Sequence, residues 1–338
     1  LAGATSTIKD ALGFSAVGIT GSAIIQADEI ERLHLEATFA MNKTQSSGSG
    51  PSAENKSETG TDFKAYLDAI SWKVNGKAKN CLDPEASGSA PLDVKIGAQN
   101  LPIKFGANDG MSIKKLELGF TLASQNGDIT PLGVFGGIET AGKLSFKAFE
   151  LSDIGFAAGV GKLESYVGAK ARANFQGTVM QVAFLAGKMC NLDVLKSLDP
   201  LAASFLKAPE GGAFKGAYVR GSASFPFINF GCLLQAGASA DVGAWVFGND
   251  QDQWTVGGLV AGGIYGKAIC IVSAKGKITL AGQYANNAFS FLGTGWVGGG
   301  IGFCEPEEWN TPEDVANDGM CGTATASLKA TYTDGSFS

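Results

Sequence analysis

The chain has little of what most catalytic sites need. It contains a single histidine, His34, among 338 residues. It also lacks the Gly-x-Ser-x-Gly, His-Glu-x-x-His and Walker A patterns of common hydrolases and nucleotide-binding enzymes. His34 lies among alternating polar and apolar residues, which favours a surface position over proton transfer or metal binding. The sequence therefore predicts no catalytic, cofactor-binding or metal-binding residues and a protein that is not an enzyme.

Charge is scarce as well. Charged residues make up 17% of the chain, compared with about 25% in soluble domains. The net charge is −6 and there is no run of Lys or Arg, so we expect no nucleic-acid partner. The acidic stretch from Glu305 to Asp318 offers oxygen ligands for calcium but does not match the calcium-loop pattern. We expect a solvated loop there.

Uninterrupted apolar runs are missing too. A transmembrane helix needs about 20 mostly apolar residues. The most suggestive stretch, residues 262–282, contains Lys267, Lys275 and Lys277. A helix would scatter these lysines around its circumference, whereas a strand places all three on one face. We therefore expect one long strand here, and we expect no membrane span.

Glycine and period-two alternation are abundant. The chain has 48 glycines, and its apolar residues recur at every second position, the pattern of a half-buried strand. The sequence therefore predicts a mainly β fold, a long-stranded antiparallel meander forming a sheet or a sandwich-like arrangement. Leucines at helical spacing and the pair Asp199-Pro200 predict one short helical insertion around 192–207.

The predicted elements suggest two regions. Residues 1–186 are expected to form an N-terminal antiparallel β region that carries a mobile polar insert at 43–61, which has too few apolar side chains to become ordered. Residues 187–338 are expected to contain the helix and four long strands, continuous with the first region. Within these strands, alternation predicts that Ile264 and Ile278 are buried and that Lys275 and Lys277 face water.

Six cysteines stand far apart, without metal or redox spacing, which favours three disulfides in an oxidising compartment. Cys232 and Cys270 are equidistant from the turn at Gln251, so we expect them to lie opposite each other and to pair. The remaining expected pairs are Cys304 with Cys321 and, by elimination, Cys81 with Cys190. Because directly opposed strand residues lie slightly too far apart for a relaxed disulfide, Cys232 with Cys190 remains an alternative.

Two sequons, at Asn42 and Asn55, lie in a polar stretch rich in Ser and Thr. They permit glycosylation of an exposed segment, and chance matches in such a stretch are an equal alternative. The ends of the chain suit a subunit processed from a longer precursor.

These expectations favour a non-enzymatic structural protein, extracellular or in the cell envelope. We expect it to be a subunit of a filament, layer or surface assembly, associating with itself or with neighbouring envelope proteins through exposed strand edges. One alternative is a carrier that wraps its long sheet around a hydrophobic ligand. Another is an outer-membrane β-barrel, favoured by aromatic residues near strand ends, although the expected strands are about twice as long as barrel spans of about 9 to 11 residues.

Overall fold

The structure, a computed structural model, describes residues 14–26, 29–41, 62–77, 81, 90–105, 110–125, 128–203, 205–231, 233–285, 288–306, 309, 311–317, 321–333 and 336–337. The described strands form one 17-stranded sheet, which confirms the predicted antiparallel β meander. The polar insert expected at 43–61, the sequons at Asn42 and Asn55, and Cys232 lie outside the described residues.

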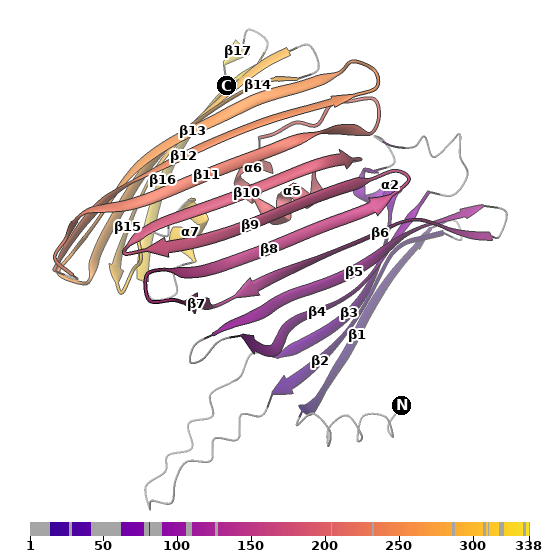
Figure 1. The fold of residues 1–338 in the computed structure, drawn as a ribbon, viewed down its shortest axis with the longest axis horizontal. Helices are drawn as coiled ribbons and strands as arrows, with labels where there is room; N and C mark the ends of the chain where they lie inside the picture. The colour runs from indigo at the N-terminus through magenta and orange to yellow at the C-terminus, as the bar shows by residue number, and fades with distance from the viewer. Residues whose placement is uncertain are drawn as a thin grey trace, which may run out of the picture.

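The sheet is built by consecutive strands that each pair antiparallel with the next, except that β6 and β7 both pair with β8. Figure 1 shows it strongly curved, with β1 near one edge and β15 to β17 near the other. The strands are β1 (Phe14–Gln26), β2 (Glu29–Met41), β3 (Phe63–Ser71), β4 (Leu92–Phe105), β5 (Met111–Gln125), β6 (Asp128–Ala141), β7 (Lys143–Ser145), β8 (Glu150–Gly161), β9 (Ser165–Phe175), β10 (Thr178–Met189), β11 (Phe214–Asn229), β12 (Leu234–Asn249), β13 (Trp254–Ala268), β14 (Val272–Ala285), β15 (Ala288–Gly302), β16 (Cys321–Thr333) and β17 (Ser336–Phe337).

The described helices are short and pack against the concave side of the sheet (Figure 1). They are α2 (Trp72–Asn75), α5 (Asp193–Leu198), α6 (Pro200–Ala203) and α7 (Pro312–Ala316). The helical insertion predicted around 192–207 is confirmed by α5 and α6, and the Asp199 carboxylate accepts a hydrogen bond from the Ala202 amide at the start of α6. Among the described residues, no helix is long and apolar enough to cross a membrane.

The long strand expected at 262–282 is in fact two strands, β13 and β14, joined by a tight turn. Ile269 and Cys270 both have positive φ, 53° and 64°, and Ala268 pairs with Val272 across the turn. This turn is difficult to predict from the sequence. Asn and Gly usually occupy the positions of positive φ in tight hairpin turns, whereas a β-branched residue such as Ile269 seldom does. The strands from β11 to β16 are consequently 13 to 16 residues long.

The turn around Gln251 lies where the sequence predicts it. Leu234 pairs with Ala268 and Gln235 with Lys267, so positions equidistant from Gln251 are opposite each other in β12 and β13. Cys270 lies just beyond the paired residues, in the β13–β14 turn rather than within a strand. It is disulfide-bonded, and the expected pair with Cys232 involves a residue that the structure does not describe.

The assignment of buried and exposed faces from the sequence is wrong. Ile264 and Ile278, expected in the core, are 69% and 63% exposed, whereas Lys275 and Lys277, expected in water, are each 2% exposed. The largest buried cluster lies between the concave face of β10 to β14 and the insertion that contains α5 and α6. Its bulkiest members are Leu185, Leu195, Phe214, Tyr218, Trp245 and Phe247. The concave face is therefore the inner face, and the apolar side of each strand points outward.

The described disulfides join Cys81 to Cys190 and Cys304 to Cys321, the pairings expected from the sequence. Two disulfides indicate that the chain folds in an oxidising environment. Cys304 is fully buried on the inner side, and it packs with Trp296, Trp309 and Val315. This disulfide closes the segment that carries α7 and holds it against the inner face.

Replacing Cys304 and Cys321 together by serine is expected to lower the free energy of unfolding by about 2 to 3 kcal/mol, because the bond closes a loop of 17 residues. Urea unfolding of the wild type and the double variant, followed by tryptophan fluorescence, measures this difference. Non-reducing peptide mapping provides the control. Recovery of Cys304 bonded to Cys81 would contradict the connectivity described above.

Candidate functional site

The outward face of the sheet carries no charge over a wide area. Along β11 to β15, burial alternates with the strand period, and apart from Lys215 and Asn229 at the two ends of β11 the exposed members of each strand are apolar. From Ala217 to Phe227, Leu234 to Val246, Trp254 to Ala268, Val272 to Tyr284 and Phe289 to Ile301, the outward positions hold only Ala, Gly, Val, Leu, Ile, Phe, Trp or Tyr. Soluble monomers seldom expose a contiguous apolar patch larger than a few hundred Å².

Exposed aromatic side chains border this area at both ends of the strands. At one end lie Trp254, Tyr284, Phe289 and Phe291, and the register places Tyr284 directly opposite Phe289. At the other end lie Phe225, Phe227, Phe230 and Phe303. Between the two groups, the outward residues are aliphatic or glycine. The outward face is thus an aliphatic band bordered by aromatic rings.

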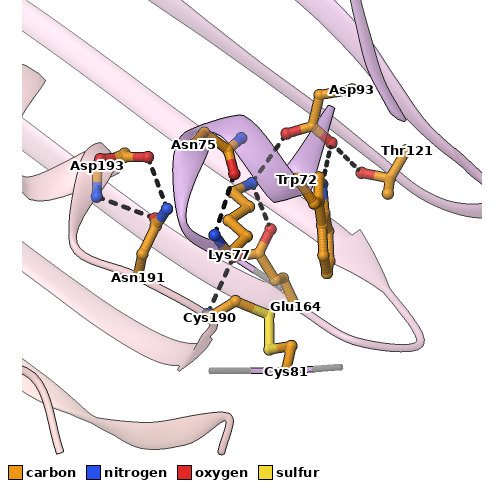
Figure 2. The surroundings of a disulfide bond; sticks show 10 residues. All are labelled: Trp72, Asn75, Lys77, Cys81, Asp93, Thr121, Glu164, Cys190, Asn191 and Asp193. Carbon is orange, nitrogen blue, oxygen red and sulfur yellow. Dashed lines mark hydrogen bonds and ion pairs between the residues drawn. A yellow bond between two sulfur atoms is a disulfide. The ribbon is translucent and has the colours of Figure 1, made fainter. Parts of the chain in front are cut away.

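The inner face carries the charges, and one buried cluster surrounds the Cys81–Cys190 disulfide (Figure 2). Asp93 on β4 accepts hydrogen bonds from Trp72 Nε1 and Thr121 Oγ1, both at 2.8 Å. Lys77 Nζ donates to Asp93 at 3.0 Å and to Glu164 at 2.8 Å. These contacts connect the segment containing α2 with β4, β5 and the start of β9.

The pairing keeps Lys77 charged in spite of its burial. Burial by itself would lower the pKa of Lys77, but the carboxylates of Asp93 and Glu164 outweigh it and raise the pKa above its usual value. Glu164 also accepts a hydrogen bond from the Cys190 amide at 3.0 Å, which ties the ion pairs to the disulfide. The described bonds of these charged groups join α2, β4, β5 and the disulfide, so the cluster fastens the inner segments to the sheet.

A second cluster joins α6 to the wall formed by β11, β12 and β14. Arg220 Nη1 lies 2.9 Å from Asp199 Oδ1, and its Nη2 lies 2.9 Å from Asp241 Oδ2. Lys277 Nζ lies 2.6 Å from the same Asp241 oxygen. The Tyr218 hydroxyl donates to Asp199. A single aspartate on β12 therefore forms ion pairs with two cations, one from β11 and one from β14.

Asp241 depends on those two cations. Burial by itself would raise the pKa of Asp241, but Lys277 and Arg220 outweigh it and lower the pKa below its usual value. The side chains of Asp241 and Lys277 are each 1% exposed, so water screens this pair poorly. Removing the carboxylate would leave Lys277 buried without this partner and Arg220 paired with Asp199 alone.

The remaining inner polar side chains also bind inserted segments. Gln283 on β14 donates to the Phe205 carbonyl at 2.8 Å and accepts from the Lys207 amide at 3.1 Å. Lys267 on β13 donates to the Cys304 carbonyl at 2.7 Å. The inner face therefore holds the described parts of two insertions, which lie within residues 190–213 and 303–320.

Two cavities flank α5 and α6 on this face. One of about 280 Å³ lies beside Lys77, Lys95 and Glu117. The other, of about 780 Å³, lies between Lys170, Arg220 and Asp199 on one side and the start of α7 on the other. The helices thus fill part of a polar interior and leave charged cavities beside them.

The structure places the residues singled out in the sequence as follows. His34 lies on the inner face of β2, where Nδ1 contacts the Asp68 carboxylate on β3. The acidic loop contains α7, whose first turn is capped by Thr311 and Asp314. Among the described residues, no group of three His, Cys, Asp or Glu side chains is arranged for a metal ion.

The second cluster was not recognised in the sequence. Asp241 stands between Ala240 and Val242 in a strand of small apolar residues, and this isolated charge is the available signal. Its partners Arg220 and Lys277 come from β11 and β14, so sequence alone gives no reason to connect them. Comparison with protein-family models, with curated proteins and with solved structures finds no match for this chain.

Replacing Asp241 by asparagine is expected to destabilise the fold by about 3 to 5 kcal/mol, because Arg220 and Lys277 lose the shared carboxylate while buried. Urea unfolding at neutral pH measures the difference. Asp250→Asn, at an exposed position in the β12–β13 turn, is the matched control and should change stability little.

The stability difference between the wild type and Asp241→Asn should change with pH in one direction. Because the folded pKa of Asp241 is lowered, its stabilisation is fully present above the unfolded pKa of about 3.9 and is lost as pH falls through the folded pKa. The gap between the wild type and Asp241→Asn should therefore stay constant above about pH 4 and narrow at lower pH. A gap that widened on acidification would contradict the assignment.

Proposed function

We propose that the protein is an integral membrane protein of the transmembrane β-barrel class, whose outward face contacts lipid and whose polar interior is partly filled by its own helices. The observation that carries this proposal is the uncharged outward face of β11 to β15, set against an inner face that holds the buried ion pairs. Barrels in membranes alternate apolar outward and polar inward residues along every strand. Soluble sheets with one solvated face alternate in the opposite sense.

The dimensions of the outward band support the proposal. The outward residues of β14 run from Val272 to Tyr284. At about 3.3 Å per residue and a tilt of about 45°, this stretch spans about 28 Å along the membrane normal. A bilayer has a hydrocarbon core about 30 Å thick. The sequence suggested strands about twice as long as a barrel span, which argued against a barrel. The strands from β11 to β16 are 13 to 16 residues long, so this objection no longer applies.

The aromatic borders support it further. Aromatic residues such as Trp and Tyr are enriched at the two interfaces of a bilayer, where the ring meets lipid and the polar atom meets water. Trp254 and Tyr284 lie at one end of the band. Lys215 and Asn229 lie just outside the apolar stretch of β11, at its two ends. Polar groups thus begin where the headgroup region would begin.

A second candidate is the structural assembly expected from the sequence, in the cell envelope or outside the cell, where other protein copies would cover the same apolar face. The size of that face supports this candidate equally, because an uncovered surface of this kind promotes association in water. The carrier receives less support, since the inner face that would wrap a hydrophobic ligand is polar and already occupied by α5 and α6.

Closure of the sheet is the first test. Among the described strands, β1 and β16 are not paired with each other. In hydrocarbon, the unpaired N–H and C=O groups of such edges would each cost several kcal/mol. In lipid vesicles we therefore expect the amides of β1 and β16 to exchange hydrogen as slowly as those of β13. Mass spectrometry of exchanged peptides measures this, and rapid exchange confined to both edges would contradict a closed barrel.

Lipid contact at Trp254 is the second test. The chain has five tryptophans. Trp254 is 50% exposed on the outward face, whereas Trp72, Trp245, Trp296 and Trp309 are buried. In vesicles containing brominated lipids, we expect quenching of tryptophan fluorescence that is strongest for bromines near the headgroup, because Trp254 lies at the edge of the band.

Two variants complete this experiment. Trp254→Phe should remove most of the quenching, and the matched variant Trp245→Phe, which alters an inner tryptophan, should retain it. A protein that stays in buffer without detergent, shows no quenching and forms filaments would instead favour the structural assembly.

A further inference from the structure

The outward face differs between its two halves. Over β4, β5, β8 and β10 it carries large side chains, among them Ile96, Leu118, Phe156 and Phe184. Over β13 to β16 large side chains alternate with glycines instead, and a groove of about 670 Å³ crosses these four strands. Lipid chains can pack against a smooth or an uneven surface, so contact with lipid alone does not explain why the two halves of the outward face differ.

The groove has a regular relief that the strand register creates. Ile278 on β14 lies opposite Gly262 on β13 and Gly295 on β15. Two residues away on β14, Gly276 lies opposite Ile264 on β13 and Val297 on β15. Each projecting side chain is therefore bordered by pits on the neighbouring strands.

The pattern continues onto β16, where Leu328 lies opposite Gly295, and Ala326 lies opposite Val297. Leu328 is 76% exposed and Val297 is 60% exposed. We call the outward side of β13 to β16 the relief wall.

We propose that the relief wall is the contact surface for a second copy of this chain within the membrane. Projections and pits that alternate along two directions fit a copy of themselves related by a two-fold axis, because the projections of one copy enter the pits of the other. In lipid, association gains little from the hydrophobic effect and depends on close packing, which small residues at the contact permit. The wall carries no charge, so pairing two copies buries no unpaired ion.

The area of the wall is sufficient for a specific dimer. Four strands spaced about 4.8 Å apart give a width of about 19 Å across the strands, and the outward stretch of each strand is about 40 Å long at about 3.3 Å per residue. Full contact over this area would bury about 760 Å² per copy, or about 1,500 Å² in total, which lies within the range for specific interfaces.

The glycines of the wall allow a sharp test. A Cβ atom added at Gly262 or Gly295 meets no other atom within 4 Å. In the double variant Gly262→Leu and Gly295→Leu, the Cβ atoms therefore meet no neighbour in the single chain, and the leucines fill the pits that a partner would enter. Gly221, on the outward face of β11 and outside the wall, also has open space around its missing Cβ. Gly221→Leu is the matched control.

The experiment measures energy transfer between donor-labelled and acceptor-labelled full-length copies, mixed in vesicles at increasing lipid excess. We expect the wild type and Gly221→Leu to show transfer above the level of random mixing. We expect the double variant to fall to that level. Random-level transfer for the wild type, or unchanged transfer for the double variant, would overturn the proposal.

Native mass spectrometry of the same samples tests whether lipid, rather than a second copy of the chain, occupies the groove. A monomer that retains one lipid, and loses it in the double variant, would assign the groove to lipid and overturn the dimer. The inference rests on the proposed membrane location. Trp254 quenching in the same vesicles distinguishes a failure of the dimer from a failure of the membrane location. Quenching with random-level transfer rejects only the dimer, whereas absent quenching rejects the membrane location.

Discussion

The structure depends on one constraint, the placement of the charged side chains of its central strands on the concave face of a single curved sheet, which leaves the convex face apolar. Because successive residues of a strand point to opposite faces, this choice fixes every position once it is made. The helices α5, α6 and α7 follow from it, since they pack on the concave side (Figure 1). The uncharged convex face follows as well, and with it the proposed contact with lipid.

A polar inner face must satisfy its own buried groups, and here the insertions do so. Asp241 pairs with two cations, Asp93 receives three hydrogen bonds, and Gln283 binds the backbone that follows α6. A buried carboxylate without such partners would cost several kcal/mol. The ion pairs and the disulfides therefore serve the same purpose, which is to hold short segments against the inner face of the sheet.

The sequence allowed most of the fold to be predicted. Alternation indicated an antiparallel meander, and the leucine spacing before Asp199-Pro200 indicated the helical insertion. The turn at Gln251 set the register of β12 with β13. The turn at Ile269 and Cys270 was missed because its residues are atypical of positive φ, and the expected strand was consequently too long.

The sequence by itself determined which side chains share a face, because the period of two is a local property of a strand. Only the tertiary structure decided which face is inside. That choice depends on where the sheet curves and where the insertions pack, and lysines such as Lys275 and Lys277 fit either a wet outer surface or a paired polar interior. The partners of Asp241 could not be predicted either, since Arg220 and Lys277 come together with it only when the strands of the sheet pair.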